Sequence, residues 1–99
     1  MTSLSLVIRP EAQADVAGAV EWYARERLEL GIDFALAVQA CFNRIREAPE
    51  FSPVVHREIR RAFVGRFPYL VFFRVEPSEV IVLAVMHGAR RPATWKRRR

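Results

Sequence analysis

The sequence is poor in the residues that bind metals, form disulfides or cradle phosphates. It contains one cysteine and two histidines, and its four glycines are scattered at positions 18, 31, 65 and 88. Metal sites need several His, Cys or carboxylate side chains at ligand spacing, and phosphate loops need clustered glycines, so we expect neither a metal nor a cofactor. Cys41 lies in an apolar helical pattern, which predicts a buried free thiol in a reducing compartment.

Long apolar runs are absent as well. No stretch approaches the roughly 20 apolar residues that a membrane helix needs, and no early apolar run has the flanks of a secretory signal. We therefore expect a cytoplasmic protein that does not bind membranes. The chain has 99 residues, of which 52% are hydrophobic, and this is enough for one core. Residues 1–99 are accordingly predicted to form a single domain.

Charge is divided unevenly along the chain, although the formal net charge is only +5. Residues 1–50 hold five Arg against eight Asp or Glu, whereas residues 51–99 hold eleven Lys or Arg against three Glu. All six charges after His87 are positive, and they form a basic C-terminal tail at about 90–99. Such a surface attracts an anionic partner, either nucleic acid or an acidic protein segment.

The first half of the chain predicts one strand and two helices. Residues 4–8 carry apolar side chains at alternate positions (Leu4, Leu6 and Ile8), as a short strand does. Apolar residues then recur at three- and four-residue steps over 10–28, and again from 32 or 33 to the proline at 49. This pattern predicts a helical hairpin with its break at Gly31.

The second half is rich in β-branched and aromatic residues interleaved with arginine, which is typical of strands. Three strands are predicted, at about 55–64, 69–75 and 80–86. Short turns join them, so they should be antiparallel neighbours. The predicted class is α+β, with a helical hairpin packed on a small antiparallel sheet in the order β-α-α-β-β-β.

Basic and aromatic residues of the sheet and tail are the candidates for function. They are Arg57, Arg60, Arg61, Arg66, Tyr69, Arg74, His87, Arg90, Arg91 and Trp95. In one interpretation they bind RNA and assist attack of a 2′-hydroxyl on the neighbouring phosphate, with arginine stabilising the phosphorane and His87 or Tyr69 moving the proton. In the other, the arginines form a binding surface for an acidic partner.

Four of these residues also have structural interpretations. Arg74 lies in a strand among apolar neighbours and needs a counter-ion, for which a helix carboxylate is the candidate. Trp95 can fasten the tail to the sheet edge, Tyr69 can belong partly to the core, and His87 can be a strand-end residue.

Several segments together resemble the RelE/ParE superfamily, the toxins of bacterial type II toxin–antitoxin pairs. They are Glu-Trp-Tyr at 21–23, Ala-Pro at 48–49, the run Arg-Phe-Pro-Tyr-Leu-Val-Phe-Phe-Arg-Val at 66–75, and Ala-Val-Met-His-Gly-Ala-Arg-Arg-Pro at 84–92. The resemblance covers nearly the whole chain. It implies a toxin that inhibits growth unless it is bound in a hetero-oligomer by an antitoxin, whose acidic or amphipathic C-terminal segment wraps across the sheet and helices.

Two activities occur within this superfamily. RelE-like members cut messenger RNA in the ribosome with sheet arginines and a C-terminal tyrosine, whereas ParE-like members poison DNA gyrase and lack that set. Here Tyr69 stands at the position of the strand arginine and Trp95 at that of the tyrosine, and Arg90 or Arg91 matches the tail arginine. The resemblance therefore favours a non-enzymatic, ParE-like inhibitor of gyrase. The alternatives are an mRNA endonuclease using His87, Arg90, Arg91 and Tyr69, and an inactive relative that only binds its antitoxin.

Overall fold

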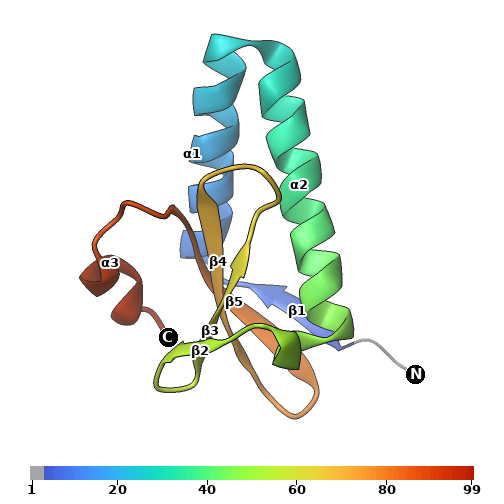
Figure 1. Cartoon of the computed structure of the whole chain (residues 1–99), viewed down its shortest axis with the longest axis vertical. Coiled ribbons are helices and arrows are strands. Elements are labelled where there is room, and N and C mark those ends of the chain that lie inside the picture. Colours follow the sequence, from blue (N-terminus) through green and yellow to red (C-terminus); the bar gives the residue numbers. More distant parts are fainter. Residues whose placement is uncertain (1–3) are drawn as a thin grey trace.

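The computed structural model describes residues 4–99, which form two long helices, a five-stranded sheet and a short C-terminal helix (Figure 1). The α+β class and the predicted order of strand, two helices and three strands are confirmed, with an additional strand and the final helix. The elements in chain order are β1 (Ser5–Ile8), α1 (Pro10–Glu26), α2 (Leu28–Glu47), the 3-10 turn η1 (Pro49–Phe51), β2 (Val54–His56), β3 (Ile59–Phe63), β4 (Tyr69–Val75), β5 (Glu79–His87) and α3 (Pro92–Lys96).

The sheet is mixed, with the strand order β1-β5-β4-β3-β2. Strands β2 to β5 pair antiparallel, as predicted from their short turns. Strand β1, however, pairs in parallel with β5, with Ser5 opposite Glu79. The helical hairpin carries the chain from β1 at one edge of the sheet to β2 at the other edge, and β5 returns to lie beside β1. The prediction of a wholly antiparallel sheet was therefore wrong.

The strand predicted at 55–64 is divided in two. Strands β2 and β3 are separated by a tight turn at Arg57 and Glu58, and Arg57 adopts a positive φ of 52°. Prediction of a single strand was wrong here because neither turn residue is a glycine or an asparagine, the usual residues at positive φ.

The hairpin does not break at Gly31, which was also predicted wrongly. The two helices are joined at Arg27, whose extended backbone (φ −155°, ψ 138°) interrupts them, and Gly31 lies buried inside α2. A Cβ on Gly31 would lie 2.8 Å from the Cβ of Ala24 and 3.0 Å from the carbonyl oxygen of Val20. This glycine therefore allows α1 and α2 to approach closely.

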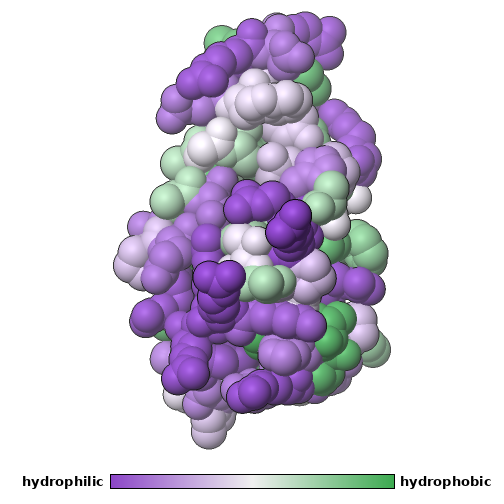
Figure 2. All heavy atoms as spheres, turned by 90° about the vertical axis from the view of Figure 1, so that its left-hand side faces the viewer, coloured by the Kyte–Doolittle hydropathy of each residue, from purple (hydrophilic) through white to green (hydrophobic). Residues whose placement is uncertain are grey.

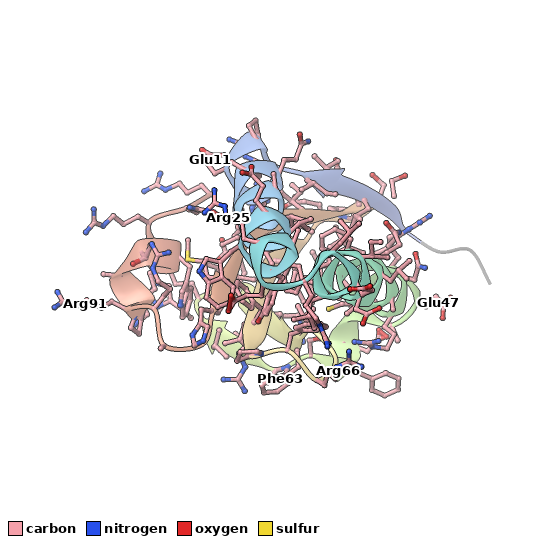
Figure 3. All side chains as sticks on the ribbon, turned by 90° about the horizontal axis from the view of Figure 1, so that it is seen from above. Glu11, Arg25, Glu47, Phe63, Arg66 and Arg91 are labelled. Carbon is pink, nitrogen blue, oxygen red and sulfur yellow. The ribbon has the colours of Figure 1, made fainter. Side chains whose placement is uncertain are left out.

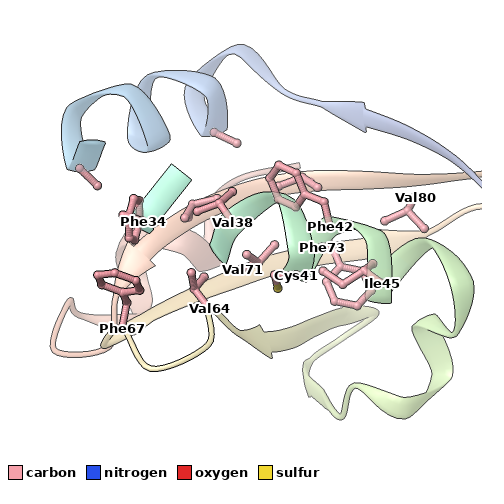
Figure 4. Packing of buried hydrophobic residues seen from close by; sticks show 14 residues of the cluster. Phe34, Val38, Cys41, Phe42, Ile45, Val64, Phe67, Val71, Phe73 and Val80 are labelled. Carbon is pink, nitrogen blue, oxygen red and sulfur yellow. The ribbon is translucent and has the colours of Figure 1, made fainter. Parts of the chain in front are cut away.

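The main core lies between the helical hairpin and one face of the sheet (Figure 4). Among the helices, α2 contributes most of the buried side chains of this core, including Phe34, Val38 and Ile45. These pack on the inward side chains of β4 and β5. Cys41 is fully buried among them, as predicted. The buried side chains of α2 thus recur at the three- and four-residue steps that the sequence predicts.

A smaller core lies on the opposite face of the sheet and is covered by α3. The Trp95 ring stacks on Phe72 with centroids 4.1 Å apart and an interplanar angle of 13°, and only 8% of Trp95 is exposed. The other buried members of this cluster are Ile59, Leu83, Ala84 and Met86. Trp95 does fasten the tail, as predicted, but to the face of the sheet rather than to its edge.

Candidate functional site

Three of the four candidate catalytic residues border one groove between α1 and the end of β5. This groove, of about 290 Å³, is called the His87 groove; its lining includes Asp15 and Trp22 of α1, together with Tyr69, His87 and Arg90. Arg91, the fourth candidate, does not line it. Arg91 precedes α3 and projects outward from the molecule (Figure 3).

His87 is the exposed last residue of β5 and stands opposite Tyr69 of β4. The two rings meet edge to face with centroids 5.5 Å apart. The Nδ1 atom of His87 accepts a hydrogen bond from the backbone N–H of Ala89 at 3.0 Å. A neutral His87 ring therefore carries its proton on Nε2, which is the nitrogen left for a ligand.

Tyr69 belongs partly to the core, as predicted. Its ring packs at 4.9 Å from Phe34 and 6.0 Å from Tyr23, measured between centroids. Burial, and secondarily the neighbouring Tyr69, raises the pKa of Tyr23. The Tyr23 phenol is therefore neutral at physiological pH.

A second hollow, of about 540 Å³, lies between the β2–β3 turn, β4 and the C-terminal residues. It is called the tail pocket, and its lining residues are His56, Arg57, Glu58, Ile59, Arg74, Leu83, Lys96, Arg97, Arg98 and Arg99. Arg74 forms its ion pair here with Glu76 of the β4–β5 loop, not with a helix carboxylate. The face that carries α3 is largely hydrophilic in its lower half (Figure 2).

The other predicted binding arginines do not converge on either hollow. Arg60 donates a hydrogen bond to the Ser52 carbonyl at 2.7 Å, and Arg66 pairs with Asp33 at 3.3 Å. Arg61 borders a small groove of about 170 Å³ that His87, Arg90 and Trp95 also line. The Nε atom of Arg61 is buried without a hydrogen-bond partner.

Two features with a functional bearing were missed from the sequence. Asp15 accepts hydrogen bonds from the Val85 backbone N–H and from Arg98 at the end of the chain. The exposed side chains of Leu28, Ile32 and Leu36 form an apolar stripe on α2. The spacing of four residues between these three could have revealed the stripe, whereas nothing local predicts a contact between Asp15 and Arg98.

Two classes of site are not found in residues 4–99. They contain no group of three His, Cys, Asp or Glu side chains placed to hold a metal ion. None of the helices over the same range is long and apolar enough to cross a membrane.

Comparison with known families is decisive for the identity of the fold. The family model described as the ParE toxin of the type II toxin–antitoxin system parDE matches residues 6–92. The chain belongs to the ParE toxin family. Its role is accordingly that of a toxin, and the mixed sheet with its helical hairpin is a ParE-like fold.

A solved structure of the ParE fold agrees with this assignment. The chain superposes on a structure titled as the chromosomal ParDE TA system from P. aeruginosa with a TM-score of 0.76, covering 86% of this chain and 96% of the other. Sequence identity is 18%, so this likeness shows the fold alone. No curated protein matches the chain in sequence.

Proposed function

We propose that this ParE-family toxin inhibits bacterial growth by binding DNA gyrase in the cytoplasm, and that an antitoxin neutralises it. The state of Trp95 carries the choice against RNA cleavage. This residue stands where the resemblance places the C-terminal tyrosine of the RNA-cleaving toxins, and it is buried in a stack on Phe72. An indole has no acidic hydroxyl, so no proton can be moved from this position.

The apolar stripe on α2 supports the antitoxin as partner. Leu28 is 68% exposed, Ile32 53% and Leu36 64%. Together with Val20, Ala24, Gly31 and Ala35 they line an apolar groove of about 240 Å³. A contiguous apolar strip on a helix is typical of protein interfaces, and it can bind the apolar side of an amphipathic segment.

Induction of the toxin in bacteria without its antitoxin tests the proposed target. We expect growth to stop and plasmids to lose negative supercoiling while protein synthesis continues at first. A halt in translation with normal plasmid topology would overturn the gyrase proposal. Normal growth would instead identify an inactive relative that only binds its antitoxin.

Antitoxin docking is tested separately by a charge placed in the apolar groove. Ile32→Glu should abolish co-purification with the antitoxin, because a carboxylate would be desolvated there without a partner. Gln39→Glu adds the same charge to an exposed position of α2 outside the groove and should leave binding unchanged. Equal binding by both variants would exclude the groove as the docking site.

A second candidate function, RelE-like cleavage of mRNA on the ribosome, is favoured by one observation. Arg61, His87 and Arg90 line one groove, so three cationic or proton-carrying groups border a space that one phosphate could enter. This function predicts codon-phased transcript cleavage that His87→Ala and Arg90→Ala abolish. Toxicity unchanged by both substitutions, with intact mRNA, would exclude it.

A further inference from the structure

We propose that the tail pocket binds the phosphates of a nucleic-acid backbone. Seven of its ten lining residues carry a charged side chain, and Glu58 is the one carboxylate among them. The cations come from three separate parts of the chain: Arg57 from the β2–β3 turn, Arg74 from β4, and the others from the C-terminal residues. The fold thus gathers positive charge that is dispersed in the sequence.

Most of this charge lacks a counter-ion within the protein. Arg74 pairs with Glu76 and Arg98 with Asp15. Over residues 4–99, no carboxylate lies within 4.0 Å of the charged groups of Arg57, Lys96, Arg97 and Arg99. Like charges around one hollow raise its potential, and an anion bound there would relieve their repulsion.

The backbone of Arg57 gives a second, independent indication. It is the one non-glycine residue with a positive φ in the part of the chain that the structure describes. Glycine or asparagine would adopt this conformation more readily than arginine does. The turn itself does not need a long cationic side chain at this strained position. Backbone strain of this kind is common at functional sites.

The chemistry of the pocket favours phosphate over an acidic peptide. Its two apolar lining residues, Ile59 and Leu83, are 5% and 1% exposed, so an amphipathic peptide would find no apolar anchor. The nearby edge strand β2 has three residues and a register shift, which makes it a poor template for an added strand. Guanidinium groups match phosphate oxygens in paired hydrogen bonds.

The contact should be to the backbone and not to the bases. Base stacking needs an exposed aromatic face. Trp95 is buried against Phe72, and the half-buried His56 ring in the pocket wall packs edge to face against Trp95 with centroids 6.3 Å apart. The pocket shares no lining residue with the His87 groove or with the apolar groove of α2. Binding at this site does not depend on gyrase being the target, and the same toxin could hold DNA while it contacts a protein partner.

Fluorescence anisotropy with labelled duplex DNA and with single-stranded RNA tests the inference. Affinity should fall steeply between about 50 and 200 mM salt, because bound phosphates release counter-ions. Arg57→Gly should fold at least as well as the parent protein, since glycine accepts the positive φ. The double variant Arg57→Gly/Arg97→Gln should lose about tenfold in affinity or more, with a salt slope lower by about two.

Arg25→Gln is the matched control, because it also removes one positive charge. Arg25 is an exposed residue of α1 whose side chain is 76% accessible, and it lies outside the tail pocket. The Arg25→Gln variant should bind DNA and RNA with an affinity less than twofold below that of the parent protein. DNA and RNA are distinguished by their relative affinities, and either one bound through Arg57 and Arg97 would support the proposal.

Three results would overturn the proposal. Equal losses of affinity in Arg25→Gln and Arg57→Gly would mean a diffuse basic surface, and a folded protein that binds no nucleic acid at low salt would exclude the site. The third result is Arg57-dependent binding of poly-glutamate that is tighter than binding of either nucleic acid. The last result would make the pocket a site for acidic protein segments.

Discussion

Asp15 and Arg98 lie 83 positions apart and form a partly buried ion pair, with Arg98 Nη1 2.5 Å from Asp15 Oδ2. The same carboxylate oxygen accepts the Val85 backbone N–H at 3.0 Å, and Arg98 also donates to the Leu83 carbonyl at 3.2 Å. Strand β1 pairs with β5 only as far as Val82. The ion pair therefore supplies polar partners to the part of β5 that β1 leaves uncovered, and it fastens the C-terminal residues to α1.

Removal of either partner should destabilise the fold. Arg98→Ala leaves a partly buried carboxylate with one hydrogen bond and should lower the free energy of unfolding by about 1–3 kcal/mol. Asp15→Asn keeps an acceptor for Val85 and should cost less than Asp15→Ala. Urea denaturation of the single and double alanine variants measures the coupling, and strictly additive losses would show that the two side chains do not interact.

Two glycine substitutions in the hairpin should have opposite effects. Gly31→Ala places a methyl group 2.8 Å from the Ala24 Cβ and should cost about 1–3 kcal/mol, although alanine favours helix. Gly18→Ala meets no atom within 4 Å and should stabilise the protein by about 0.5–1 kcal/mol. Thermal unfolding of both variants checks the pair. A stabilised Gly31→Ala would contradict the close approach of α1 and α2.

These residues show where prediction from sequence reaches its limit in the fold. Periodicity identified the buried side of α2 because each apolar position is set by the local helical repeat. Gly31 was wrongly interpreted as a helix break. A glycine is needed there because α2 lies close to Ala24 of α1, and local sequence does not encode a contact between two helices. The divided strand at Arg57 was missed for a related reason, since a non-glycine residue at positive φ is held by tertiary structure.

Loss of the Trp95 ring should uncover the smaller core. Trp95→Ala removes the cover over Phe72, Leu83 and Met86 and should cost about 3–5 kcal/mol. Trp95→Phe keeps an aromatic ring on Phe72 and should cost less than half as much. Thermal unfolding gives the stability, and binding of a hydrophobic dye reports the exposed face. Unchanged stability in Trp95→Ala would mean that α3 is not packed on the sheet.

The buried thiol of Cys41 should make stability depend on alkaline pH. Burial raises its pKa to about 11 from 9.0, against a smaller opposing effect of Arg44. Below pH 9 the thiol is neutral in both states, and between about pH 9 and 11 it ionises only in the unfolded chain, so stability falls with rising pH by on the order of 2 kcal/mol.

Cys41→Ala removes this titration and is the control, because Tyr23 also has a raised pKa and titrates in both proteins. The difference in unfolding free energy between parent and variant should narrow from pH 9 to pH 11. The native thiol should also resist alkylation near pH 8 and react quickly in denaturant. Rapid alkylation of the folded protein would contradict its burial.

The candidate site was predictable in composition and only partly in arrangement. Tyr69, His87 and Arg90 line one groove. The register of β4 and β5 places Tyr69 opposite His87, and Arg90 follows His87 by three residues. Arg60 is instead engaged by Ser52, eight residues earlier in the chain, and Arg66 by Asp33 of α2, 33 residues earlier. Residue type and strand position predict which side chains are available, but tertiary contacts decide which of them remain free for a partner.

Supercoiling by purified DNA gyrase tests the central claim most directly. Folded toxin added to gyrase, relaxed plasmid and ATP should suppress supercoiling in proportion to the amount added, and an excess of antitoxin should restore it. Undiminished supercoiling at a molar excess of toxin that still binds its antitoxin would contradict the account.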